Sequence, residues 1–322
     1  MKITVLGAGA WGTALAIRWA AQHEVSLIAR REEHRADMQR AQRNVRYLPD
    51  SAFPKKNFTI AAQVSPDCDL IVLGVPTSGL VDALRAVEKL PNTPLIALCK
   101  GFVGAGALLP AQCIASSRNA PFGILSGPSF AQEVARGLPT AVMLASADSA
   151  FANKFANALR DEALRIYPTT DGVGVEGGGA LKIVLAIAAG LCDGVQLGAN
   201  ARAALITRGL AEITRLAVAM GGQAETLAGL AGMGDVVLTC TGDLSRNRRV
   251  GLGLAQGKTL PEIVAALGHV AEGIPAAQNS RLFSNISQIE LPICEAVAQL
   301  LEGTSTPKQA VAALMARNVR EA

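Results

Sequence analysis

Short apolar runs recur along the first half of the chain and alternate with polar and glycine positions. The first covers 3–6 and the second covers 25–29, with a helical pattern over 13–21 between them. Further apolar runs follow at 58–61, 69–74, 94–98, 122–125, 140–144 and 163–167. Alternation of short buried strands with helices is typical of a parallel sheet covered by helices on both faces. We therefore predict an α/β fold with a doubly wound, mostly parallel Rossmann-type sheet.

The second half has a different pattern, rich in alanine and leucine at helical spacing. Long stretches cover 181–197 and 201–220, and shorter ones follow 257. We predict a dinucleotide-binding domain at 1–177 and an all-helical, substrate-binding domain at 178–322, since 322 residues exceed the usual size of one core. A glycine cluster spans this boundary and predicts either a flexible hinge or a tight turn into the first long helix. Its members are Gly172, Gly174, Gly177, Gly178 and Gly179.

The first strand ends in a glycine pattern that is suited to a pyrophosphate. Gly7, Gly9 and Gly12 have the G-x-G-x-x-G spacing, between a predicted strand and a predicted helix. The first glycine permits a tight turn, the second lets backbone N–H groups approach the phosphates, and the third lets the helix lie close to the strand. The helix N-terminus adds positive potential. This context predicts a dinucleotide site.

The end of the second strand bears on which dinucleotide is preferred. A site selective for NAD usually has an acidic residue there, which binds the ribose 2′-hydroxyl. This chain has Arg30 and Arg31 instead, so we expect NADPH/NADP to be favoured over NADH/NAD because guanidinium groups attract a 2′-phosphate. The alternative is that both arginines only solvate the strand end.

Composition and charge narrow the class of protein. The chain is 50% hydrophobic and 17% charged, which excludes general disorder, and its net charge of +4 suits anionic small molecules better than nucleic acid. Six cysteines without a C-x-x-C pair argue against a zinc site or a disulfide framework, so no metal is expected. The apolar N-terminus stops at the glycines without a cleavage pattern, and the segment 183–192 is too short to cross a bilayer. We expect a cytoplasmic protein without membrane insertion.

A lysine in an apolar segment is the candidate for acid–base chemistry. The chain has only three histidines, two of them in or beside predicted helices of the nucleotide domain. Lys182 stands in an apolar helix start at the domain junction, where partial desolvation would lower its pKa. It could then exchange a proton with a substrate oxygen. The alternative is a lysine whose ammonium reaches solvent.

Three further segments suit an anionic substrate. Ser245 has the position of a helix N-cap, so Arg246 and Asn247 would lie in the first turn and could bind a phosphate. A basic patch for nucleic acid is the alternative, but the segment is short and lacks basic or aromatic neighbours. Lys100 and Ser129 follow strands at the carboxyl edge of the sheet, where they could face the nicotinamide end of the cofactor, although each could be an ordinary loop or cap residue.

Six motifs in order resemble those of the bacterial NAD(P)-dependent sn-glycerol-3-phosphate dehydrogenase family, over essentially the whole chain. They are 7–16, 127–131, 179–182, 200–209, 232–235 and 245–249. The resemblance implies that Lys182 is the proton acceptor. It assigns substrate contacts to Lys100, Gly127, Ser129, Asp235, Ser245, Arg246 and Asn247. It assigns cofactor contacts to Ala10, Trp11, Arg30, Ala131, Arg246, Val270 and Glu272. The family often has Asn after the catalytic lysine, where this chain has Ile183, and we assign Ile183 no role.

The resemblance further implies hydride transfer between a nicotinamide and C2 of a three-carbon phosphate. The reaction interconverts sn-glycerol 3-phosphate and dihydroxyacetone phosphate and supplies glycerol phosphate for phospholipid synthesis, in an enzyme expected to be a homodimer. Two alternatives stay open at this point. One is a reductase for another small hydroxy acid, against which the predicted phosphate site speaks, and the other is a regulator that binds NADPH without turnover.

Overall fold

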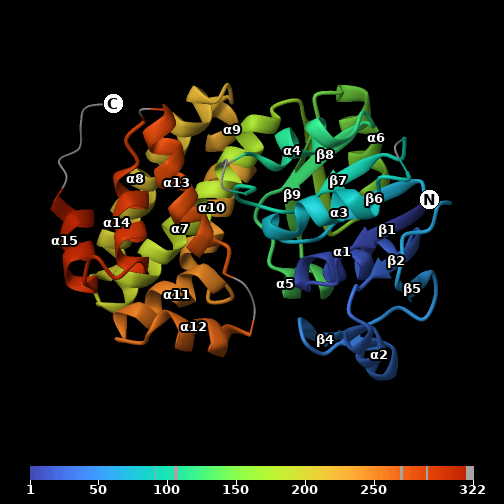
Figure 1. The fold of residues 1–322 in the computed structure, drawn as a ribbon, viewed down its shortest axis with the longest axis horizontal. Coiled ribbons are helices and arrows are strands. Elements are labelled where there is room, and N and C mark those ends of the chain that lie inside the picture. The colour runs from blue at the N-terminus through green and yellow to red at the C-terminus, as the bar shows by residue number, and fades with distance from the viewer. Residues whose placement is uncertain (91, 105–107, 269–270, 288, 317–322) are drawn as a thin grey trace.

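The computed structural model describes residues 1–90, 92–104, 108–268, 271–287 and 289–316. An eight-stranded sheet with helices on both faces forms the first half, and a group of helices forms the second half beside it (Figure 1). The strand order is β10-β9-β8-β7-β6-β1-β2-β5. Every neighbouring pair is parallel except β8 and β9, which are antiparallel. The predicted α/β class and mostly parallel sheet are confirmed.

The strands of this sheet correspond to the apolar runs of the sequence. Their bounds are β1 Lys2–Leu6, β2 Glu24–Ile28, β5 Phe58–Ala61, β6 Leu70–Leu73, β7 Leu95–Ala97, β8 Phe122–Ser126, β9 Thr140–Ala145 and β10 Leu164–Thr169. β6 is buried at every residue because it lies in the middle of the sheet, covered on both faces. A separate antiparallel pair, β3 Arg43–Asn44 and β4 Leu48–Ala52, follows the helix α2 Glu32–Ala41.

The helices of the first half cover the sheet and connect its strands. They are α1 Ala10–Trp19, α2 Glu32–Ala41, the 3₁₀ helix η1 Thr77–Gly79, α3 Leu80–Ala86, α4 Pro110–Ser117, α5 Ala131–Ala135 and α6 Ser149–Leu159. The first helix starts at Ala10 rather than at residue 13, because Gly9 takes the N-cap position. The glycine motif therefore includes the first turn of the helix as well as the loop before it.

The second half is built around one buried helix. α7 Gly172–Gly194 packs against the helices that follow it in the chain. These are α8 Gly198–Ala219, α9 Ala224–Ala228, the π-helix η2 Leu230–Gly234, α10 Asp235–Thr241, α11 Arg246–Ala255, α13 Gly273–Ser287, α14 Pro292–Leu301 and α15 Pro307–Ala316. The remaining helix, α12 Leu260–Leu267, packs against α11. The predicted helical C-terminal region is confirmed.

The glycine cluster before Lys182 is helical, so its prediction as a hinge or a tight turn was wrong. All five glycines lie in α7, which starts directly after β10. A Cβ at Gly177 would lie 3.0 Å from Cβ of Ala217, and one at Gly178 would lie 2.6 Å from the carbonyl oxygen of Ala231. The glycines let α8 and η2 approach α7 closely. The domain boundary proposed between residues 177 and 178 falls within this helix and stays a prediction.

α7 is also longer than the apolar segment from which membrane insertion was argued. Among the described residues it is the helix with the length and hydropathy of a membrane span, at 23 residues and a mean hydropathy of 1.6. Its most apolar stretch is fully buried by the surrounding protein. The argument from length was therefore wrong, and burial marks α7 as a core helix of this fold.

Candidate active site

The turn between β1 and α1 has the geometry expected from its glycines. Gly7 has a φ of +120°, and a Cβ there would lie 2.6 Å from the carbonyl oxygen of Gly74. A Cβ at Gly12 would meet the carbonyl oxygen of Gly7. Gly9 differs, because its Cβ would meet only the Gly74 oxygen, 3.9 Å away. Gly7 and Gly12 thus have packing roles, whereas Gly9 faces open space.

This open space fits a dinucleotide pyrophosphate. Gly9 caps α1 without any side-chain acceptor, and no acidic residue stands in the first turn. The first-turn N–H groups, among them those of the half-buried Ala10 and Trp11, are therefore available to phosphate oxygens. At the end of β2, Arg30 and Arg31 are exposed, and Arg31 donates to the hydroxyl of Tyr47 at 3.3 Å. Their contact with a 2′-phosphate stays a prediction.

Lys182 is buried in the third turn of α7, just after the glycine-rich part, and its side chain is 6% exposed. Its ammonium forms an ion pair with Oδ1 of Asp235 and donates to Oγ1 of Thr239 at 3.0 Å. Asp235 begins α10, and Thr239 lies one turn later on the same face. The Thr239 hydroxyl donates in turn to the backbone oxygen of Asp235 at 2.6 Å. Lys182 is thus held by two atoms of α10, Oδ1 of Asp235 and Oγ1 of Thr239.

The environment lowers the pKa of Lys182 to about 7. Burial is the main cause, because it disfavours the charged amine. The carboxylate of Asp235 raises the pKa, and the nearby Lys100 lowers it. An amine with this pKa can both donate and accept a proton near neutral pH, as general acid–base chemistry requires.

Lys100 connects the two halves of the molecule at this point. It follows β7, and its Nζ donates to Oδ2 of Asp235 at 2.7 Å and to the carbonyl oxygen of Gly127 at 3.0 Å. Ser129 donates to the same carbonyl oxygen, also at 3.0 Å. Gly127 and Ser129 follow β8, so two neighbouring strand ends and α10 meet here. The structure therefore brings together Lys100, Gly127, Ser129, Lys182 and Asp235.

The predicted N-cap at Ser245 is confirmed. Its Oγ accepts from the backbone N–H of Arg248 at 3.2 Å, and α11 begins at Arg246. Arg248 forms an ion pair with Asp193, with Nη2 2.7 Å from Oδ2, so its side chain stabilises the fold. Arg246 is exposed in the first turn, next to the half-buried Asn247. The binding of a substrate phosphate by these two residues stays a prediction.

Asn247 and Glu272 link the α11 N-terminus to the edge of the sheet. Oδ1 of Asn247 accepts from the N–H of Gly273 at 3.0 Å, and Oε1 of Glu272 accepts from the N–H of Thr77 at 3.0 Å. Burial raises the pKa of the Glu272 carboxyl. Thr77 lies just after β6, at the carboxyl edge where a parallel sheet binds ligands. Ala131, buried at the start of α5, lies outside this network, and Val270 lies outside the described residues.

Ile183 lies between these groups and the sheet edge. It is 5% exposed, and its Cδ1 is 3.8 Å from the place that a Cβ would take on Gly101. Its backbone oxygen is 2.7 Å from the corresponding place on Gly273. The side chain thus faces the ends of β6 and β7, where Thr77 is also found, and supplies an apolar wall there.

The sequence patterns missed two buried polar residues, Thr239 and Glu176. Thr239 had a signal, because it stands four residues after Asp235 and so shares its helix face. Glu176 had the same signal as Lys182, since it is a charged residue in an apolar, glycine-rich stretch. Among the described residues, no group of three or more His, Cys, Asp or Glu side chains could hold a metal ion.

Known proteins resemble this chain over nearly its full length. The N-terminal and C-terminal models of NAD-dependent glycerol-3-phosphate dehydrogenase match residues 2–152 and 171–312. A glycerol-3-phosphate dehydrogenase [NAD(P)+] of Aromatoleum aromaticum is 51% identical, with 99% of each chain covered.

Solved structures agree with this similarity. Glycerol-3-phosphate dehydrogenase from Coxiella burnetii is 39% identical with a TM-score of 0.94, covering 98% of this chain and 99% of that one. The glycerol-3-phosphate dehydrogenase of Saccharomyces cerevisiae is 25% identical with a TM-score of 0.82, over 98% and 99% of the two chains. This chain therefore belongs to the NAD-dependent glycerol-3-phosphate dehydrogenase family.

Proposed function

We propose that the protein interconverts sn-glycerol 3-phosphate and dihydroxyacetone phosphate by hydride transfer with NAD(P) as cofactor. The observation that carries this proposal is the buried Lys182 with its lowered pKa, paired with Asp235 at the edge of a dinucleotide-binding sheet. The relatives named glycerol-3-phosphate dehydrogenase [NAD(P)+] support the same substrate and cofactors.

The residues of the site have distinct tasks in this reaction. The nicotinamide, when bound, supplies the hydride or takes it up. During reduction, Lys182 donates a proton from Nζ to the carbonyl oxygen of the substrate, and during oxidation it accepts the hydroxyl proton. Asp235 holds Lys182 and Lys100 on its two oxygens, so both amines lie where the oxygen acquires charge.

The phosphate of the substrate would be bound at the N-terminus of α11. Arg246 and the amide nitrogen of Asn247 are the donors, and the Asn247 oxygen is already occupied by Gly273. Binding there fixes the distance from the phosphate to the reacting carbon and so orients C2 toward Lys182. A hydroxy acid without a phosphate would lose this contact, which disfavours the alternative of a different small-acid reductase.

The test is an absorbance assay at the band of the reduced cofactor. The purified chain is mixed with NADPH and dihydroxyacetone phosphate, and in parallel with ketopantoate. We expect NADPH to be oxidised in the presence of dihydroxyacetone phosphate and not in the presence of ketopantoate. Turnover of ketopantoate instead would indicate the other reductase class, and cofactor binding without any turnover would indicate a regulator.

Several finer assignments belong to the same proposal. NADPH is the favoured cofactor, and the enzyme acts as a homodimer in the cytoplasm, where its product enters phospholipid synthesis. Residues 1–177 bind the dinucleotide, and residues 178–322 bind the substrate. Light scattering of the purified protein at several concentrations tests the dimer, and a monomer at all of them would contradict it.

A further inference from the structure

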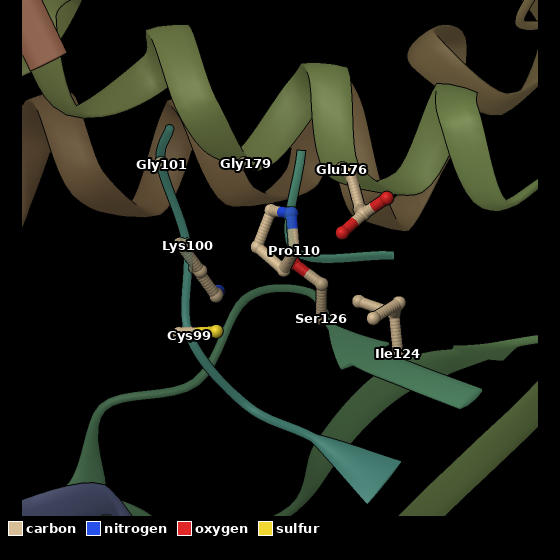
Figure 2. A pocket seen from close by; sticks show the side chains of 8 residues that line it. All are labelled: Cys99, Lys100, Gly101, Pro110, Ile124, Ser126, Glu176 and Gly179. Atoms are coloured by element: carbon tan, nitrogen blue, oxygen red, sulfur yellow. The ribbon is translucent and has the colours of Figure 1, made fainter. Parts of the chain in front are cut away.

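The helix that carries Lys182 has another charged side chain near its far end. Close to the start of α7, a Cβ on Gly179 would lie 3.7 Å from Cβ and Cγ of Lys100, and Figure 2 shows Lys100 below this part of the helix. Lys182 follows three residues later, and Asp193 stands in the last turn. At about 1.5 Å of helix rise per residue, Asp193 lies roughly 16 Å along the axis from Lys182. The proposed reaction does not use Asp193.

Both carboxylate oxygens of Asp193 bind arginines from other helices. Oδ2 accepts from Nε and Nη2 of Arg248 at 2.9 and 2.7 Å, and Oδ1 accepts from Nη1 of Arg202 at 2.8 Å. The side chains of Asp193 and Arg248 are each 11% exposed, so salt and water screen this pair little. A guanidinium that donates twice is fixed in orientation as well as in distance. Asp193 therefore holds α11 against α7 in a defined orientation.

Arg248 lies in the first turn of α11, beside the proposed phosphate donors Arg246 and Asn247. Its backbone N–H donates to Oγ of Ser245, the N-cap of this helix, at 3.2 Å. Arg248 thus connects Asp193 to the start of α11. A shift of Arg248 would move the two phosphate donors as well, because they share its helical turn.

Two other contacts of Arg248 constrain α11 less. The backbones of α7 and α11 lie close together, since a Cβ on Gly190 would be 2.0 Å from the carbonyl oxygen of Arg248. This contact limits the separation of the two helices, but it contains no directional bond. Nη1 of Arg248 also donates to Oδ1 of Asp243 at 2.9 Å, but the Asp243 side chain is 94% exposed and belongs to the loop before α11. Asp193 therefore supplies a directional connection between the start of α11 and the helix of Lys182.

We propose that Asp193 is a positioning residue, which acts through Arg248 to hold the phosphate donors Arg246 and Asn247 at a fixed distance from Lys182. The phosphate of the substrate and its reacting carbon are then both positioned from α7, at two places along the helix. With the start of α11 displaced, a bound phosphate would no longer bring C2 to Lys182. This role rests on the proposed function, because it concerns the substrate of that reaction.

The kinetic test compares Asp193→Asn with the wild type on substrates with and without a phosphate. Asparagine keeps the volume but presents a neutral amide to two guanidinium groups, so the start of α11 should shift. We expect kcat/KM for dihydroxyacetone phosphate to fall about tenfold or more. For dihydroxyacetone, which has no phosphate to bind at α11, kcat/KM should stay within about twofold of the wild type. The ratio of the two values is decisive, because a loss of folded protein would lower both equally.

The matched control is Asp161→Asn, in the sheet half. Oδ2 of Asp161 is 2.6 Å from Nη2 of Arg18, and the Asp161 side chain is 15% exposed. This variant also loses a partly buried ion pair, but far from the phosphate donors, so it should leave the substrate ratio unchanged. If Asp193→Asn fails to fold, Arg248→Lys replaces it. Lysine keeps the charge without the planar guanidinium, and the ratio should then fall by about threefold.

Either of two results would overturn the positioning role. Equal losses on both substrates in Asp193→Asn would mean that the ion pair only stabilises the fold. A wild-type ratio in Asp193→Asn, or in Arg248→Lys where that variant replaces it, would mean that the phosphate donors do not depend on this contact.

A binding measurement separates this inference from the proposed function. Calorimetric titration with sn-glycerol 3-phosphate in the presence of NADPH measures binding at the site without hydride transfer. We expect Asp193→Asn to weaken this binding by about fivefold or more, because the two ends of the ligand no longer meet their partners together. Equal affinity in the variant and the wild type contradicts the inference, and absence of binding in the wild type overturns both proposals. Weaker binding by the variant of a protein that does not reduce dihydroxyacetone phosphate would leave the positioning role standing and defeat the proposed function instead.

Discussion

In the proposed function, the two halves of the molecule recognise their ligands by different means. In the sheet half, the binding groups are mainly backbone atoms, at the Gly7 turn and at the start of α1, which has no side-chain cap. In the helical half, the binding groups are side chains on separate helices, with Lys182 on α7, Asp235 on α10 and Asn247 on α11. Backbone recognition depends on a few adjacent residues, whereas side-chain recognition depends on how distant helices pack.

One carboxylate binds a lysine from each half. Asp235 receives Lys182 from its own half and Lys100 from the other. The pocket with the chemistry therefore exists only when both halves are assembled, and neither half alone contains it. Changes on the helical side should affect turnover, and changes on the sheet side should affect cofactor binding.

The largest expected effect comes from Lys182→Ala. Without this amine, the remaining lysine is Lys100, which is held by Asp235 and the Gly127 carbonyl oxygen, so turnover should fall by a factor of about a hundred or more. Cofactor affinity should stay the same, because the glycine turn is untouched. Stopped-flow turnover and NADPH titration measure the two quantities, with the exposed Lys258→Ala as control. Near-normal turnover would remove Lys182 from the mechanism.

The glycine turn offers a pair of substitutions with different expected results. Gly12→Ala brings a Cβ against the Gly7 oxygen, so the free energy of unfolding should fall by about 1–3 kcal/mol, together with cofactor affinity. Gly9→Ala places its Cβ in open space, so it should weaken cofactor binding while leaving stability nearly unchanged. Denaturant titrations of both variants measure the free energy of unfolding, and NADPH titrations measure the cofactor affinity. Equal destabilisation by the two would refute the separate roles.

The lowered pKa of Lys182 predicts opposite pH dependence for the two reaction directions. Reduction needs the protonated amine, so kcat/KM for dihydroxyacetone phosphate should fall about tenfold between pH 6 and pH 8, while oxidation of glycerol phosphate rises. Asp235→Asn removes a group that raises this pKa, so the pH profiles of both reaction directions should shift to lower pH. Profiles that stay in place in that variant would assign the titration to another group.

The smallest expected effect concerns cofactor choice. Arg30→Ala should weaken NADPH by about fivefold to tenfold and NADH by less, because a guanidinium interacts with the additional phosphate. The side chain is 88% exposed and close to Asp82, so its loss should leave the fold intact. Titrations with each reduced cofactor provide the comparison. Equal losses would mean that Arg30 does not distinguish the two.

Local patterns predicted most of the fold, because each strand and the glycine turn depend on residues that are adjacent in the sequence. They predicted the N-cap at Ser245 for the same reason. They did not predict that Gly177 and Gly178 lie inside a helix, since the reason is the approach of Ala217 and Ala231 from elsewhere in the chain.

Partnerships across the chain were also beyond local patterns. Lys182 stood out by its apolar surroundings, but nothing nearby indicated that Thr239 would accept from it. Glu176 shared those surroundings, and its contact with Ala111 depends on α4 returning to α7. Sequence patterns thus identified Lys182, but they missed Glu176 and the Thr239 hydroxyl that binds Lys182.

The bridge from Lys100 to Asp235 has one more consequence. If the halves separated, Lys100 would leave with the sheet, and solvent would reach Lys182 and restore its ordinary basicity, above the range in which it exchanges protons readily. The protein would then be inactive even though no inhibitor is bound. Proton exchange would take place only while Lys100 and Asp235 are in contact.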